Sequence, residues 1–152
     1  LGAQNIGAGK PERAVGTLRY AICIAVGLGL AVAGAVQLAA EQLVALFTPD
    51  AAVTAAGGQY LRGYIWDCVF GGVQFSFSGY FCARGKSGLS FLHNALSILL
   101  VRIPGAYLTS LYFPQTLLPM GLASAAGSLF SSVVCLIAFA LLRRRDRLAE
   151  KN

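Results

Sequence analysis

Charged residues are spaced very unevenly along the chain, and long stretches have none. Four stretches carry at most one charge each, and they are residues 20–40, 63–83, 87–101 and 103–142. A helix needs about 20 apolar residues to cross the hydrocarbon core of a bilayer, so the last stretch of 40 residues is too long for a single crossing plus a tail. Phe113-Pro114-Gln115 offers a turn near its start. The pattern therefore predicts four transmembrane helices, at about 19–40, 62–83, 88–111 and 117–142.

The segments between the predicted helices alternate in charge. Basic residues dominate the segment 1–18, the connection between the second and third helices, and the tail 143–152. The first connection carries Glu41 and Asp50, and the third carries no charge. Because basic segments favour the cytoplasmic side, we expect a cytoplasmic loop segment at 1–18 and a basic cytoplasmic tail at 143–152.

Composition narrows the class of protein. Hydrophobic residues make up 57% and charged residues 12%, with mean hydropathy +0.67. Average soluble domains are about 45–50% apolar and about 25% charged, so a disordered chain or an ordinary soluble domain is excluded. The formal net charge of +6 is spread over loop ends, where lipid headgroups explain it, and nucleic acid is not an expected partner. The chain starts at Leu1, so we expect it to be a piece of a longer protein.

The first connection contains a helix-start signal. Thr48 fits the N-cap, Pro49 the first helical position and Asp50 the first turn. Helix-forming residues follow as far as Gly57-Gly58. We therefore expect a short outer helix at about 48–57.

Several motifs that resemble catalytic or ligand-binding signatures fail on inspection. Gly85-Lys86-Ser87 lacks the earlier glycine of a phosphate-binding loop, since Tyr80 stands there. The four cysteines show no metal spacing and His93 is the single histidine, so no catalytic residue, metal site or cofactor is predicted. The sequence offers no nucleophile, acid–base pair or metal cluster, so it does not support a membrane enzyme.

The second predicted helix has a polar face. Asp67, Gly71, Gln74 and Ser78 follow at i, i+4, i+7 and i+11, which places them on one side of a helix. A carboxylate inside a bilayer costs at least a few kcal/mol unless it faces a cavity or a partner. We therefore expect Asp67 to point into the helix bundle, and we take Asp67, Gln74 and Ser78 as candidates for a cation or substrate cavity.

The third predicted helix offers a partner for Asp67. Asn94, Ile98 and Arg102 repeat at i+4, so Asn94 and Arg102 join the cavity candidates. Asp67 lies ~9 Å and Arg102 ~13 Å below the outer end of its helix, a difference that an arginine side chain can span. The two residues can form an ion pair, share a polar cavity without contact, or reach the outer headgroups separately. Pro104 is expected to kink the helix at this level.

Pairing would decide what Asp67 can do. An unpaired Asp67 could bind Na⁺, a proton or an organic cation, whereas a tightly paired carboxylate exchanges protons poorly near neutral pH. The small residues of the first and fourth predicted helices are interpreted as packing positions rather than binding positions. They are Gly27, Ala31 and Ala35, and Ser124, Ser128, Ser131 and Cys135.

Short motifs in a fixed order cover almost the whole chain. They are Ala3-Gln4-Asn5-Ile6-Gly7-Ala8-Gly9-Lys10-Pro11-Glu12-Arg13-Ala14, Leu46-Phe47-Thr48-Pro49-Asp50, Tyr60-Leu61-Arg62, Ala83-Arg84-Gly85-Lys86-Ser87, Arg102-Ile103-Pro104 and Leu118-Pro119-Met120-Gly121-Leu122. Together they resemble the multidrug and toxic compound extrusion (MATE) transporters. The resemblance implies an all-α polytopic membrane protein, with four transmembrane helices that form most of the C-terminal lobe of a twelve-helix transporter.

The resemblance also implies a function. Members are antiporters, in which inward flow of Na⁺ or H⁺ drives export of drugs or organic cations by alternating access. Partners would be the lipid bilayer of the plasma membrane, the missing N-terminal lobe and an organic-cation substrate. Two alternatives remain: a lipid-linked oligosaccharide flippase of the same superfamily, or a free-standing four-helix membrane assembly protein. Flippase cavities tend to be strongly cationic, whereas Arg102 is opposed here by Asp67.

Overall fold

The protein is described here by a computed structural model that places residues 1–149, and this part of the chain is helical with no strand. The all-α prediction is confirmed. The helices are α1 (Gly2–Gly7), α2 (Pro11–Ala45), α3 (Ala51–Tyr64), α4 (Trp66–Ala83), α5 (Ser87–Ser97), the π-helical turn η1 (Ile98–Arg102), α6 (Ile103–Tyr112) and α7 (Leu118–Ala149).

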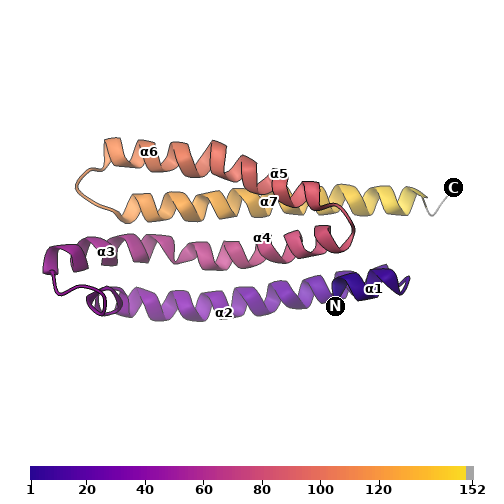
Figure 1. The fold of residues 1–152 in the computed structure, drawn as a ribbon, viewed down its shortest axis with the longest axis horizontal. Coiled ribbons are helices and arrows are strands. Elements are labelled where there is room, and N and C mark those ends of the chain that lie inside the picture. The colour runs from indigo at the N-terminus through magenta and orange to yellow at the C-terminus, as the bar shows by residue number, and fades with distance from the viewer. Residues whose placement is uncertain (150–152) are drawn as a thin grey trace.

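The long helices run side by side as parallel or antiparallel rods (Figure 1). α3 and α4 make one rod, and α5, η1 and α6 make another, with α2 and α7 as the remaining two. α4 packs against both α2 and α7, and the rod from α5 to α6 packs against α7. The inner faces of α4 and α7 are therefore the natural place for a buried polar side chain.

Three helical segments are long and apolar enough to cross a membrane by length and composition. They are Pro11–Ala45, Ser87–Tyr112 and Leu118–Asp146. The second predicted crossing, now α4, is not among them, because Asp67 and Gln74 lower the hydropathy of its 18 residues. The 35 residues of α2 would span ~52 Å, more than the ~30 Å hydrocarbon core requires.

Both predicted terminal segments differ from the structure. The segment 1–18 is not a plain loop, because α1 occupies part of it and α2 begins at Pro11 with Glu12 in its first turn. At the other end, α7 continues through 143–149 instead of ending at 142, while 150–152 lie outside the described residues. Charged residues mark where a helix leaves the apolar layer, and they do not oblige the helix to end there.

The outer helix also differs from its predicted bounds of 48–57. The N-cap is Asp50 and not Thr48: Asp50 Oδ1 accepts from the backbone N–H groups of Ala52 and Val53, at 2.8 and 3.2 Å. The helix then passes through the glycine pair and runs to Tyr64. Packing of α3 against α2 and α7 stabilises a helix that its glycines alone would end.

The apolar core lies in two clusters along the bundle. One joins the N-terminal part of α2 to the C-terminal part of α4 and to α7, and it includes Phe77, Phe81 and Cys135. The other joins the middle of α2 to the junction of α3 and α4. Near the start of α7, Gly63 and Gly121 let two backbones touch, since a Cβ on either glycine would overlap a carbonyl of the opposite helix.

The predicted packing face of α2 is wrong within this chain. Gly27, Ala31 and Ala35 are exposed, and the buried face carries Gly29, Ala33 and Val36. A Cβ on Gly29 would lie 3.1 Å from the Cα of Val69, so α4 approaches α2 on this side. A repeat of small residues shows that close packing is possible, and the neighbouring helix decides where it happens.

Candidate functional site

Asp67 and Arg102 are in direct contact, so the predicted ion pair is present. Arg102 Nη2 donates to Asp67 Oδ1 over 2.8 Å. The Asp67 side chain is 15% exposed and that of Arg102 31%. This geometry replaces the two other expectations, a shared cavity without contact and two separate contacts with headgroups.

Ser128 joins the two charges from the opposite side. Its hydroxyl donates to Asp67 Oδ1 over 2.6 Å and accepts from Arg102 Nη2 over 2.6 Å. It also accepts from Gln74 Nε2 over 3.2 Å, which uses the one donor and two acceptor sites of a hydroxyl completely. The Ser128 residue is fully buried. The four residues Asp67, Gln74, Arg102 and Ser128 are called the polar cluster below.

Ser128 is the residue that the sequence interpretation missed, because it was assigned to packing. The available signal was the recurrence of serines at 124, 128 and 131 within an otherwise apolar helix. Small polar residues serve both for close helix approach and for hydrogen bonds across helices, so spacing alone does not separate the two roles. The two roles are separated only by the position of Asp67 opposite Ser128 on α7.

The structure separates the remaining candidates. Gln74 belongs to the polar cluster and its residue is 4% exposed. Among the described residues, its Oε1 atom has no hydrogen-bond partner. Ser78 is elsewhere, with its backbone carbonyl accepting from Ser90 Oγ over 3.1 Å, and Asn94 is exposed.

The π turn explains why Asn94 does not share a side with Arg102. In η1 the Ile103 N–H bonds to the Ile98 carbonyl, one residue farther back than in an α-helix. This extra residue shifts the register, so the inner side of the rod carries His93, Ser97 and then Arg102 five positions on. The predicted Asn94–Ile98–Arg102 face assumed an unbroken α-helix and is wrong for that reason. Pro104, the predicted kink, follows directly after this turn.

Gly127 provides the space that the Arg102 side chain needs to reach the cluster. A Cβ at position 127 would overlap Arg102 Cγ and lie 3.0 Å from Nε. The Gly127 carbonyl also accepts from Ser97 Oγ over 2.6 Å. Two features of the sequence therefore set the position of the Arg102 side chain: its place in its own helix, and the glycine at position 127 of α7.

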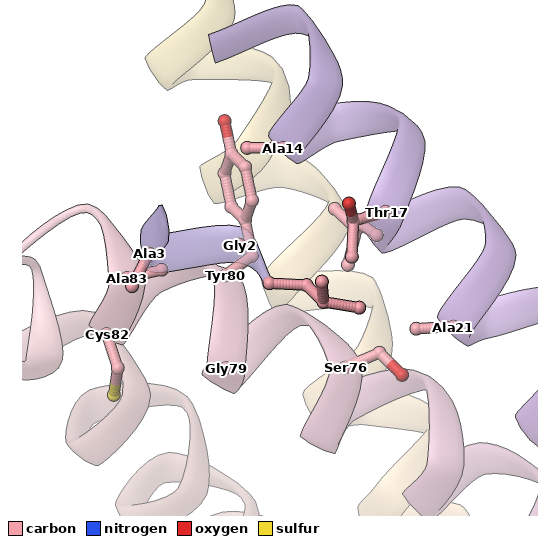
Figure 2. A pocket seen from close by; sticks show the side chains of 12 residues that line it. Gly2, Ala3, Ala14, Thr17, Ala21, Ser76, Gly79, Tyr80, Cys82 and Ala83 are labelled. Carbon is pink, nitrogen blue, oxygen red and sulfur yellow. The ribbon is translucent and has the colours of Figure 1, made fainter. Parts of the chain in front are cut away.

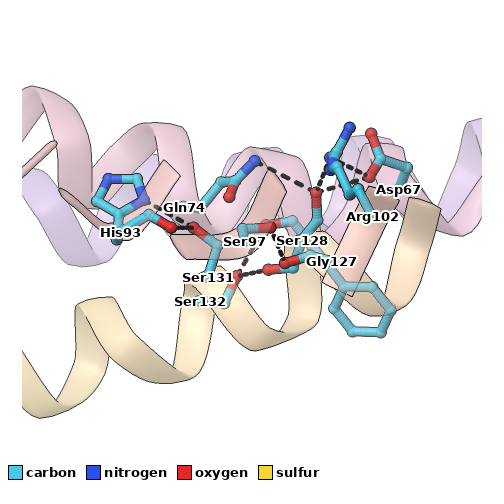
Figure 3. Close-up of polar contacts among 10 residues, drawn as sticks. Asp67, Gln74, His93, Ser97, Arg102, Gly127, Ser128, Ser131 and Ser132 are labelled. Atoms are coloured by element: carbon cyan, nitrogen blue, oxygen red, sulfur yellow. Dashed lines mark hydrogen bonds and ion pairs between the residues drawn. The ribbon is translucent and has the colours of Figure 1, made fainter. Parts of the chain in front are cut away.

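A second set of buried polar groups continues along α7. His93 Nδ1 lies 2.7 Å from Ser131 Oγ, and the single hydroxyl proton of Ser132 is shared between the carbonyls of Phe70 and Ser128. Figure 3 shows the whole row, with Asp67 and Arg102 at one end and His93 at the other. The bundle thus has a polar interior running between α4, α5 and α7.

A cavity lies away from this row. It has a volume of about 570 Å³ and lies among α1, α2 and α4 (Figure 2). Its polar side chains include those of Thr17, Ser76 and Tyr80, and none of its lining residues carries a side-chain charge. The cavity offers no group that would select an ion, so the polar cluster is the better candidate for one.

Two further ion pairs lie beside the C-terminal half of α7. Arg84 pairs with Asp146 and packs on the Tyr80 ring, while Arg143 pairs with Glu12 over 2.7 Å. The hydrogen bond to Asp146 raises the pKa of Arg84 above its already high ordinary value, so this guanidinium stays charged. These pairs tie the start of α2 and the connection after α4 to α7.

Comparison with known proteins now decides the family. The family model named MatE matches residues 1–108, well over half of the chain. The chain belongs to the MATE family. No curated protein matches it.

A solved structure supports the fold of this MATE chain. It is described as the inward-facing conformation of a multidrug resistance MATE family transporter of the MOP superfamily. The two share 23% sequence identity with a TM-score of 0.77, and the match covers 99% of this chain and 34% of the other. The chain thus has the fold of a MATE protein and spans about a third of the length of that transporter. It is a multi-pass membrane protein.

Proposed function

We propose that the chain is the C-terminal part of a secondary active exporter that exchanges Na⁺ or H⁺ for drugs or organic cations. Alternating access would occur between this bundle and the N-terminal lobe of the same protein. The observation that carries the proposal is Asp67, a carboxylate held inside a helix bundle of a MATE protein. Acidic residues in membrane spans are costly, and they commonly mark ion pathways.

The polar cluster has the chemistry that such a role needs. Na⁺ and protons bind to oxygen atoms, and the cluster offers the Asp67 carboxylate, the Ser128 hydroxyl and the free amide oxygen of Gln74. No resident cofactor is proposed, and the coupling ion is transported cargo. Asn94 and Ser78 stay candidates only for contacts outside the cluster.

The orientation follows from the charges. We propose a plasma-membrane location in which both described ends of the chain face the cytoplasm, with α4 crossing the membrane in addition to the three apolar segments. The basic residues before α2, between α4 and α5 and after the apolar part of α7 support this arrangement. A flippase is less well supported, because Arg102 is neutralised by Asp67 and the site has no excess positive charge.

The test is export of a fluorescent organic cation from proteoliposomes with an imposed Na⁺ or H⁺ gradient. The protein at its natural length is compared with Asp67→Asn, which we expect to slow gradient-driven export about tenfold or more. Asp50→Asn is the matched control, because it neutralises an exposed carboxylate while Asn still caps a helix. Unchanged export in Asp67→Asn would remove Asp67 from the coupling role.

A further inference from the structure

The guanidinium of Arg102 lies against two of the oxygen atoms that the proposed coupling role assigns to a cation. Its Nη2 atom contacts Asp67 Oδ1 and Ser128 Oγ, two of the oxygens that give the polar cluster its affinity for positive charge. A coupling ion that approaches these oxygens competes with the Arg102 donor and is repelled by its positive charge. The ion pair is therefore a closed form of the site.

The π turn is what directs Arg102 to this position. Ser97 is buried and bonded to α7, and in an α-helix the residue four positions after it, Val101, would face inward. Removing the extra residue of the π turn would rotate Arg102 by about 100° away from Asp67. Such a conversion thus separates the pair by turning α6 relative to α5.

Pro104 favours the π form. Proline has no N–H, so the Leu100 carbonyl would have no donor at position 104 in a regular α-helix, and the proline ring would crowd that carbonyl. The π turn Ile98–Arg102 ends two residues before Pro104. Single π turns inside α-helices are often found at functional sites.

We propose that Arg102 is a built-in competitor for the cation site, and that conversion of the π turn to α-helix withdraws it. The coupling cation then binds Asp67 only in the converted form. This inference rests on the coupling role proposed above. The apparent affinity for the cation is reduced by the fraction of molecules in which Arg102 is withdrawn. If that fraction is about a tenth, removal of the competitor tightens binding about tenfold.

The experiment measures cation binding directly, on detergent-solubilised protein at its natural length. Binding of radioactive Na⁺ at pH 8 tests Na⁺ as the cation. A pH dye in Na⁺-free solution follows proton release and tests H⁺ as the cation. We expect Arg102→Gln to lower the half-saturating cation concentration about tenfold. The gain should vanish when Asp67→Asn is added. Unchanged or weaker binding by Arg102→Gln would overturn the proposal.

Further variants protect the test against misfolding. Pro104→Ala restores an N–H that supports α-helix and should tighten binding about threefold, with Arg102 still present. Arg102→Lys keeps a competing charge and should stay within about twofold of the natural protein. Ser132→Ala is the control on the same helix as Ser128, since its hydroxyl bonds only to backbone carbonyls, and it should leave binding unchanged.

The outcomes separate this proposal from the function on which it rests. If Asp67→Asn abolishes binding while neither Arg102→Gln nor Pro104→Ala tightens it, the competitor role is wrong and the coupling role stands. If Asp67→Asn binds cations as well as the natural protein does, both proposals fail.

Discussion

The same chemical pair, a guanidinium against a carboxylate, occurs in two very different places in this molecule. Arg102 and Asp67 meet inside the bundle, where Ser128 bonds to both charges and Gln74 bonds to Ser128. The pairs beside the end of α7 meet at the surface, where the carboxylates of Asp146 and Glu12 are 43% and 79% exposed. The contacts are of one kind, and the surroundings decide what each pair does.

Solvation explains the difference. At the surface, water solvates both partners when they separate, so such pairs contribute about 0–1 kcal/mol. Inside the bundle, removing one partner leaves a charge without water or counter-ion, which costs about 3–5 kcal/mol in buried pairs. The surface pairs therefore act as modest ties between helices. In the inner pair, the Asp67 carboxylate strongly favours a nearby positive charge, and a transporter can use this preference.

The largest expected effect is the loss of one partner of the inner pair. Arg102→Gln should destabilise the protein by about 3 kcal/mol without Na⁺, near the lower limit for buried pairs because part of Arg102 is exposed. The check is the thermal unfolding midpoint of purified protein.

The charge exchange Asp67→Arg with Arg102→Asp should restore part of this stability. It keeps both charges while exchanging their positions. Failure of the exchange to improve on either single variant would show that the contact contributes little, which would contradict the comparison.

A middle-sized effect is expected from blocking the path of Arg102 without touching a charge. Gly127→Ala places a Cβ against the Arg102 side chain and should cost about 1–3 kcal/mol, as overpacking does. Gly34→Ala is the matched control, since a Cβ there meets nothing within 4 Å in the described chain. Equal midpoints for the two alanine variants would mean that Arg102 does not depend on Gly127.

The smallest effect is expected at the surface. Asp146→Asn removes the partner of Arg84 and should lower stability by no more than about 1 kcal/mol. Because salt screens exposed charges, the loss should disappear near 1 M salt, where the Debye length is about 3 Å. The loss from Arg102→Gln should persist there. A salt-insensitive loss at Asp146 would remove the distinction between the two regions.

Much of the fold was predictable because the bilayer imposes simple rules. Uncharged stretches of about 20 residues located the helices, and the carboxylate at Asp67 had to point inward. Similar depths in two helices allowed an ion pair with Arg102, together with two arrangements without contact, and the structure shows the pair. The differences lie at helix ends: the N-cap is Asp50 where Thr48 is expected, and most of the segment 1–18 and all of 143–149 are helical.

The sequence by itself determined the helical membrane fold, the family and the two charges of the inner pair, because hydropathy, charge and short motifs are local properties. The tertiary structure decided the rest. It showed that Ser128 is the hydrogen-bonded centre of the pair, that Gly127 makes room for Arg102, and that a π turn brings Arg102 to the buried side of His93 and Ser97 instead of the side of Asn94. These features depend on which helices are neighbours and on one extra residue in a turn, and neither is encoded in a regular repeat along the chain.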